Sequence, residues 1–132
     1  PTAVIAPDVE IGAGSVIFAQ AVIQPCCRIG DGAIVNTAAT VDHDCILGGF
    51  VHISPGAHLA GGTQIGGGSW IGIGACTRQQ IKIGANVIVG AGAAVVSDVS
   101  DGLTVIGNPA KPLIRPSENT LATESEQAGG QK

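Results

Sequence analysis

The chain has 132 residues, of which 21 are glycine and only three, Phe18, Phe50 and Trp70, are aromatic. This composition disfavours an ordinary globular core, because aromatic side chains normally supply much of the buried area. The net charge is −4 with six Lys and Arg, so a surface for nucleic acid or anionic membrane is not expected. No apolar run reaches the roughly 18 residues of a transmembrane helix. The sequence starts at Pro1 rather than Met, so the absence of a targeting segment carries no conclusion.

A period of six residues dominates the sequence. Fifteen of sixteen positions in this series are aliphatic, and Thr77 is the exception. The series is Ile5, Ile11, Ile17, Ile23, Ile29, Val35, Val41, Leu47, Ile53, Leu59, Ile65, Ile71, Thr77, Ile83, Val89 and Val95. Helices space apolar residues by three and four, and ordinary strands alternate. A sustained period of six is typical of a stacked β-solenoid.

Each hexad divides into a short strand and a corner. Strand alternation points the aliphatic residue and the small residue two positions before it inward, and the residue between them outward. The next three residues must turn the corner. All 17 glycines among residues 1–100, together with Pro7, Pro25 and Pro55, fall at these three positions, as expected for turns. A buried Thr77 hydroxyl would need a hydrogen-bond partner.

The repeat resembles that of hexapeptide-repeat proteins. The resemblance, rather than the period, implies that three hexads close a triangular coil and that the coils wind left-handed. We therefore expect an all-β, left-handed parallel β-helix of about five coils over residues 1–100. Residues 101–114 are expected to cap it, and the polar residues 115–132 to form a flexible tail.

Counting by three hexads sorts the outward residues onto three faces. The first face is polar and carries Glu10, Arg28, Ile46, Gln64, Lys82 and Ser100. The second carries Val16, Ile34, His52, Trp70 and Ile88. The third carries Val22, Thr40, His58, Cys76 and Ala94. Two largely apolar faces on one rod indicate a partner surface, and their head-to-tail contact would most simply close a homotrimer.

The three histidines lie at different places in this frame. His43 falls on a corner between Asp42 and Asp44, with Gly61 stacked above it. A histidine beside carboxylates is a candidate general base, although a solvated turn histidine is the simpler alternative. His52 lies mid-strand on the second face, so it can meet His43 only across a subunit boundary. His58, on the third face without a carboxylate neighbour, is interpreted as a contact residue.

Neither the histidines nor the four cysteines predict a metal site. The histidines occupy one corner and two faces, and no CxxC pair or zinc-type spacing is present. Cys27 and Cys45 both fall at inward positions, one coil apart. We expect them to stack as small, reduced core residues.

Four runs carry a more specific resemblance. VDHDCILGGFVHISPGAHLAG, GSWIGIGA, IGANVIVGAGAAVV and GNPAKPL resemble the sialic acid O-acetyltransferase and UDP-4-amino-sugar N-acetyltransferase family over residues 3–114. The match covers only the C-terminal β-helix part of that family, and its usual N-terminal α/β domain has no counterpart here. The resemblance implies a bacterial, cytoplasmic acetyltransferase that uses acetyl-CoA without a metal. It also implies a homotrimer with sites between subunits, and a sugar or sugar nucleotide as acceptor.

The resemblance also assigns roles to individual residues. His43 becomes the proton acceptor, and Asp44 raises its basicity. The expected contacts with acetyl-CoA are His52, Gly61, Ile73 and Ala91. The implied reaction is direct acetyl transfer to an amine or hydroxyl, without a covalent cysteine. Two alternatives remain open: a hexapeptide acyltransferase with a non-sugar acceptor, and a non-catalytic β-solenoid that serves as a scaffold.

Overall fold

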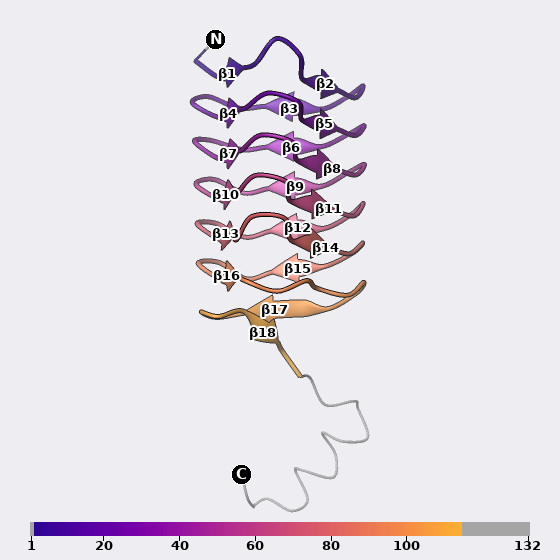
Figure 1. Ribbon diagram of the computed structural model, residues 1–132, viewed down its shortest axis with the longest axis vertical. Coiled ribbons are helices and arrows are strands. Elements are labelled where there is room, and N and C mark those ends of the chain that lie inside the picture. The colour runs from indigo at the N-terminus through magenta and orange to yellow at the C-terminus, as the bar shows by residue number, and fades with distance from the viewer. Residues whose placement is uncertain (1, 115–132) are drawn as a thin grey trace, which may run out of the picture.

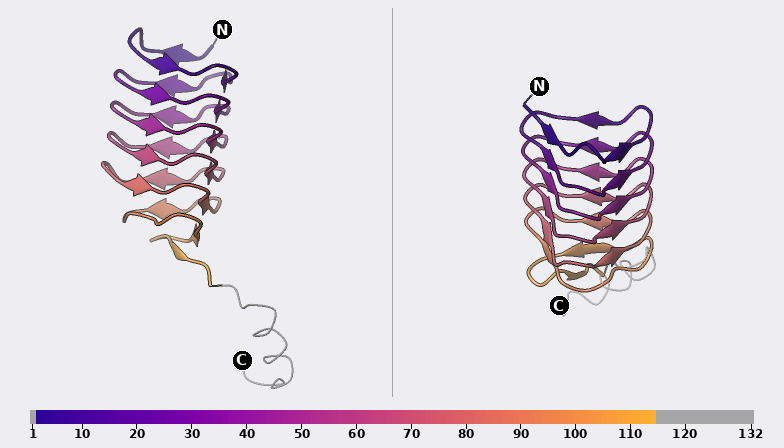
Figure 2. Two further views of the ribbon diagram at one scale, coloured as in Figure 1. Left: turned by 90° about the vertical axis from the view of Figure 1, so that its right-hand side faces the viewer. Right: turned by 45° about the horizontal axis from the view of Figure 1, so that its top comes forward.

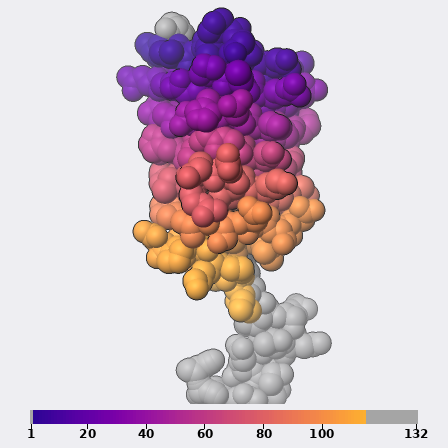
Figure 3. Space-filling view, viewed as in Figure 1, coloured from indigo at the N-terminus to yellow at the C-terminus, as the bar shows by residue number. Residues whose placement is uncertain are grey.

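The computed structural model describes residues 2–114, which form a column of stacked coils built only from β-strands and turns (Figures 1 and 3). In Figure 1 the chain runs from left to right on the near side of each coil and returns on the far side as it descends from the N-terminus. This sense of rotation is left-handed, as expected. Within this range no helix is long and apolar enough to cross a membrane.

The strands form three sheets, which are the three sides of the coils (Figure 2). Sheet A contains β1 (Val4–Ile5), β4 (Val22–Ile23), β7 (Thr40–Val41), β10 (His58–Leu59), β13 (Cys76–Thr77) and β16 (Ala94–Val95). Sheet B contains β2 (Glu10–Ile11), β5 (Arg28–Ile29), β8 (Ile46–Leu47), β11 (Gln64–Ile65) and β14 (Lys82–Ile83). Sheet C contains β3 (Val16–Ile17), β6 (Ile34–Val35), β9 (His52–Ile53), β12 (Trp70–Ile71), β15 (Ile88–Val89), β17 (Thr104–Ile106) and β18 (Lys111–Pro112). All pairs are parallel except the last, β17 with β18, which is antiparallel.

The pairing register confirms the three predicted faces through the first five coils. His58 pairs in sheet A with Thr40 and Cys76, its equivalents in the preceding and the following coil. Trp70 likewise pairs with His52 and Ile88 in sheet C. Because the short strands are followed by corners of fixed length, each residue stacks on its equivalent in the next coil.

The core is a narrow stack of aliphatic and small side chains. Ile23, Val41, Ile53 and Ile71 are at most 1% exposed, and each contributes about 1.5–3 kcal/mol when fully buried. Smaller side chains lie between them, many of them alanine or cysteine. They come from the inward position two residues before each aliphatic residue. Cys27 and Cys45 are both buried and free, as predicted.

Most corners are turned by a residue with positive φ at the third position after the aliphatic residue. Glycine takes this position at several corners, for example Gly62 with φ 74°. Asp44 takes it with φ 59° and Phe50 with φ 60°. Aspartate tolerates this region better than most residues, and its conformation there has consequences for the candidate site.

The repeat continues beyond the predicted boundary at residue 100, but its register shifts. Ile83 pairs with Val99, and Val89 pairs with Val105, whereas three full hexads would have brought Asp101 and Gly107 to these places. The corner after Val95 is therefore shorter than the others, and β16, the Val99 bridge and β17 make a sixth coil. A fixed count of six could not detect this, so Ser100, assigned to the first face, lies on a corner instead. The expected tail, residues 115–132, lies outside the described residues.

Candidate active site

His43 lies on the corner between β7 of sheet A and β8 of sheet B. The Asp42 carboxylate accepts the backbone N–H of His43 at 2.8 Å. The positive φ of Asp44 turns its side chain back toward the imidazole, and Asp44 Oδ2 lies 2.9 Å from His43 Nδ1. The predicted pair of histidine and carboxylate is therefore formed within one corner.

The hydrogen bond to Asp44 determines the proton chemistry of His43. Since Nδ1 donates to the carboxylate, Nε2 is the nitrogen free to accept a proton. This bond is the main cause that raises the pKa of His43 above its ordinary value, with a smaller contribution from the negative charge of Asp42. The His43 side chain is 61% exposed, so the imidazole is both accessible and more basic than usual.

Gly61 makes room for the imidazole itself. A Cβ atom at Gly61 would lie 2.6 Å from both Cε1 and Nε2 of His43. The stacking of Gly61 above His43 could have left room for a ligand, but the His43 ring itself fills this space, because it folds along the corner onto the next coil. Ligand space lies beside the ring instead.

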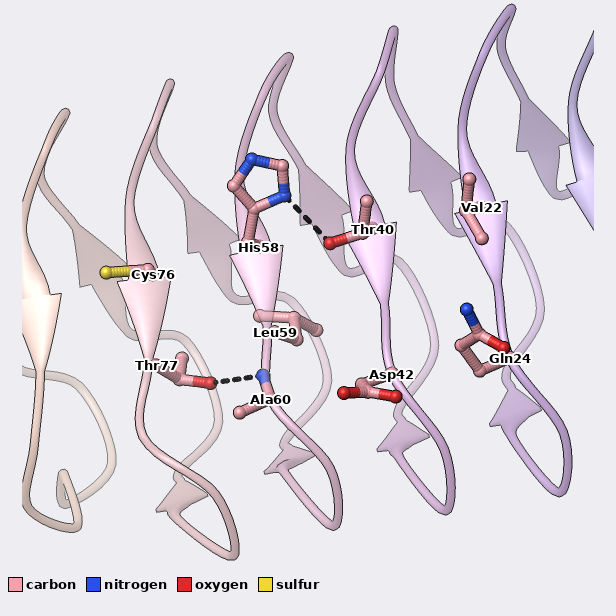
Figure 4. A pocket seen from close by; sticks show the side chains of 9 residues that line it. All are labelled: Val22, Gln24, Thr40, Asp42, His58, Leu59, Ala60, Cys76 and Thr77. Atoms are coloured by element: carbon pink, nitrogen blue, oxygen red, sulfur yellow. Dashed lines mark hydrogen bonds between the residues drawn. The ribbon is translucent and has the colours of Figure 1, made fainter.

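Two neighbouring cavities provide that space. A cavity of about 340 Å³ is lined by residues 42–44, residues 60–62, Gln79 and Gln80. A second cavity, of about 480 Å³, lies on sheet A and includes Thr40, His58 and Thr77 (Figure 4). Both cavities include Asp42 and Ala60, so they meet at the His43 corner.

His52 lies on sheet C in a different environment. Its ring packs against Trp70 with a centroid separation of 4.4 Å, and burial lowers the pKa of His52. Asn36 Nδ2 lies 3.2 Å from His52 Nε2. Asn36 Oδ1 accepts from the backbone N–H of Thr37 at 2.7 Å, which turns the amide nitrogen toward His52. Nε2 is therefore an acceptor, and the neutral ring carries its proton on Nδ1.

The remaining predicted residues divide between two places. Gly61 contacts His43, whereas Ile73 and Ala91 stack on the corner between sheets C and A, where Gly92 N–H donates to the Ile73 carbonyl at 2.8 Å. His58 lies on sheet A and its Nδ1 is 2.8 Å from Thr40 Oγ1. One chain does not bring His43 and His52 together. Residues 2–114 also hold no cluster of three or more His, Cys, Asp or Glu suited to a metal ion.

Sequence reasoning gave no role to Asn36 or to Trp70 beside His52. Asn36 directly follows the aliphatic Val35, where the corner begins. Its contact with the backbone of Thr37 is local and is typical of an Asx turn. Its contact with His52 joins adjacent coils, so only their stacking reveals it. The sequence did signal that Thr77 needs a partner, and the structure supplies two, Ala60 and Thr63.

Comparison with solved structures identifies the type of β-helix. The acetyltransferase domain of PglB from Neisseria gonorrhoeae FA1090 is 61% identical, with a TM-score of 0.85, and was also solved with acetyl coenzyme A. The match covers 86% of this chain and 55% of that one. This chain has the hexapeptide-repeat β-helix of these sugar N-acetyltransferases. The predicted resemblance is thereby confirmed.

Two further solved structures match this chain over a similar share of its length. PerB from Caulobacter crescentus, solved with CoA and GDP-perosamine, is 45% identical with a TM-score of 0.86, over 86% of this chain and 55% of that one. WeeI from Acinetobacter baumannii AYE is 37% identical with a TM-score of 0.82, over 85% and 55%. The chain thus spans about half the length of these relatives. No family model and no curated protein matches the sequence.

Proposed function

We propose that this chain is the acetyl-transferring β-helix of an acetyl-CoA-dependent N-acetyltransferase, acting on the amine of a nucleotide-linked amino sugar. The observation that carries the proposal is the His43–Asp44 pair, held at 2.9 Å against Gly61 beside an open cavity. A 61% identical β-helix was solved with acetyl coenzyme A. PerB was solved with an amino-sugar nucleotide, which favours an amine over a hydroxyl as acceptor.

In this mechanism His43 Nε2 takes the proton from the attacking amine, while Asp44 stabilises the imidazolium that forms. The amine nitrogen bonds to the thioester carbonyl carbon, and the C–S bond breaks. The leaving thiolate takes the proton from the His43 imidazolium, so CoA leaves as its thiol and His43 returns to its neutral form. The Gly61 N–H is the donor proposed for the thioester carbonyl oxygen. The neutral His52 Nδ1–H is the donor proposed for the adjoining part of acetyl-CoA. Holding both substrates in register would supply much of the rate.

The site is completed between subunits of a homotrimer. His43 and His52 lie on different sides of one coil, so they act together only if sheet C of one subunit lies beside the His43 corner of the next. Sheet C exposes apolar side chains suited to such contact: Val16, Trp70 and Ile88 are 45–52% exposed. In this arrangement Ile73 and Ala91 form the wall along which the pantetheine arm lies. We also propose a cytoplasmic location, where acetyl-CoA and sugar nucleotides are available.

The direct test is acetyl transfer with detection of the released thiol. The acceptors would be a UDP-4-amino sugar, GDP-perosamine, dTDP-4-amino-4,6-dideoxyglucose and sialic acid. We expect thiol release with a 4-amino sugar nucleotide. We also expect CoA to raise Tm, because a ligand at 100 times its Kd stabilises the folded state by about 2.7 kcal/mol. No release and no Tm shift at millimolar CoA would instead support a non-catalytic scaffold.

Replacing Asp44 with asparagine is expected to move the acidic limb of the kcat/KM profile to lower pH and to reduce its plateau by about tenfold. The bond to the Asp44 carboxylate raises the pKa of His43, and an uncharged amide gives less of this effect. His43 is a base only when neutral, so a lower pKa leaves it active to lower pH but makes it weaker. Thiol release measured across the acidic and neutral pH range would show the shift. An unmoved limb would mean that His43 is not the titrating group.

A further inference from the structure

The ladder of sheet A is interrupted next to the His43 corner. At the preceding coil Asp42 N–H donates to the Leu59 carbonyl, and at the following coil Arg78 N–H donates to the Val95 carbonyl. Between them, Ala60 N–H donates at 3.1 Å to the Thr77 hydroxyl rather than to the Thr77 carbonyl (Figure 4). β10 and β13 accordingly pair at only one position, His58 with Cys76. The one polar residue of the aliphatic series is the residue that replaces the ladder bond.

Thr77 belongs to a closed ring of hydrogen bonds with Thr63 and Ala60. The Thr63 hydroxyl donates to the Ala60 carbonyl at 2.7 Å. Since that proton is used, the 3.0 Å contact between the two hydroxyls has Thr77 donating to Thr63. Thr63 is 0% and Thr77 9% exposed, and hydrogen bonds in such a ring strengthen one another. The ring therefore holds both backbone groups of Ala60.

The same ring orients the N–H of Gly61. The Ala60 carbonyl and the Gly61 N–H belong to one trans peptide, so they point in opposite directions. Thr63 holds the carbonyl inward, and Cys45 Sγ lies 3.3 Å from the same oxygen. Burial raises the pKa of Cys45 to about 12, so its thiol stays protonated and donates. The Gly61 N–H is consequently turned away from the core.

No acceptor within residues 2–114 satisfies the Gly61 N–H, and Gly61 lines the cavity beside His43. The equivalent peptide one coil earlier differs in this respect. There Cys27 Sγ donates to the Asp42 carbonyl at 2.8 Å, but the His43 N–H is capped by the Asp42 side chain at 2.8 Å. Alanine at position 60 has no side chain to do this, so the donor remains available.

We propose that Thr63 and Thr77 are positioning residues for acetyl transfer, which hold the Ala60–Gly61 peptide so that its N–H donates to the acetyl carbonyl oxygen as negative charge develops there. This inference rests on the proposed function. Thr63 is fully buried. Thr77 borders the sheet A cavity, but the role proposed for its hydroxyl is within the ring of hydrogen bonds, so both threonines act through the peptide. The Gly61 N–H stabilises this charge better for two reasons. It is fixed in place before the reaction, and hydrogen bonds to the Ala60 carbonyl polarise the peptide to which it belongs.

The deciding variant is Thr77→Val in the full chain. Valine restores the aliphatic series and lets Ala60 N–H return to the ladder, so Tm should be unchanged or higher. The Ala60–Gly61 peptide would then shift, and kcat should fall by about tenfold to a hundredfold with little change in KM for acetyl-CoA. Thr77→Ser retains the hydroxyl and should keep most of the activity. Assays would use the 4-amino sugar nucleotide that the unmodified chain acetylates fastest.

A matched control removes a hydroxyl that bridges two backbone groups at a distant corner. Ser15 Oγ donates to the Gly30 carbonyl at 2.8 Å and accepts from Ala33 N–H at 3.0 Å. Ser15→Ala should lower Tm and leave kcat unchanged, which is the pattern of a purely structural hydroxyl.

The outcomes separate this inference from the proposed function. If the unmodified chain releases no thiol with any acceptor, both are overturned. If it is active and Thr77→Val keeps its full kcat, only the positioning role is overturned. The same holds if Thr77→Ser loses as much activity as Thr77→Val, or if kcat falls only together with the folded fraction.

Discussion

Replacing His43 with alanine is expected to lower kcat/KM for acetyl transfer by about two to four orders of magnitude, the range for loss of a general base. The imidazole lies beside the cavity, and a carboxylate on one side of the ring leaves Nε2 free on the other. Its side chain is 61% exposed, so little packing is lost and Tm should remain close to that of the unmodified chain. Near-normal kcat/KM in this variant would rule out the proposed role.

A mixing experiment extends this prediction to the proposed arrangement of subunits. Chains with His43→Ala keep an intact sheet C, and chains with His52→Ala keep an intact His43 corner. Random reassembly of the two inactive chains in equal amounts would place one intact corner beside one intact sheet at about a quarter of the interfaces of a cyclic trimer. We therefore expect activity to return on mixing. Mixtures that remain as inactive as their parents would contradict a site shared between subunits.

Replacing Gly61 with alanine is expected to lower kcat/KM by about a hundredfold without unfolding the chain. The new Cβ would lie 2.6 Å from Cε1 and Nε2 of His43, so the imidazole must swing away from its position against the next coil. Gly61 does not have positive φ, so alanine causes no backbone strain. A misplacement of about 1 Å in a catalytic group suffices for a loss of this size. Thiol release and Tm measured on the same preparation would test both parts of the prediction.

Gly49→Ala is the matched control. Gly49 occupies the same position on the corner between sheets B and C, where an added Cβ would meet only the Asp31 carbonyl oxygen at 3.4 Å. This is an ordinary contact, and Gly49 also lacks positive φ, so activity and Tm should both be retained. If Gly61→Ala keeps its activity as Gly49→Ala does, catalysis does not require the His43 ring to lie against Gly61.

The fold and the first residues of the site were predictable because the repeat is so regular. The period assigned His43 to a corner. Counting then assigned His52 and His58 to separate faces once the resemblance had supplied the coil of three hexads. The count failed where the chain shortens a corner: after Val95 the partner of Ile83 is Val99 and not Asp101, and no residue type marks the shorter turn. The sixth coil and the position of Ser100 were therefore missed.

The sequence alone determined the solenoid, the inward and outward faces and the corner that carries His43, because these follow from the period and from alternation along a strand. Only the tertiary structure decided how side chains are oriented within that frame. It folds the His43 ring onto Gly61, orients His52 through Asn36, and encloses Thr63 and Thr77 in a ring around Ala60. These contacts depend on the rotation of single side chains and peptides between adjacent coils, and a period does not encode that rotation.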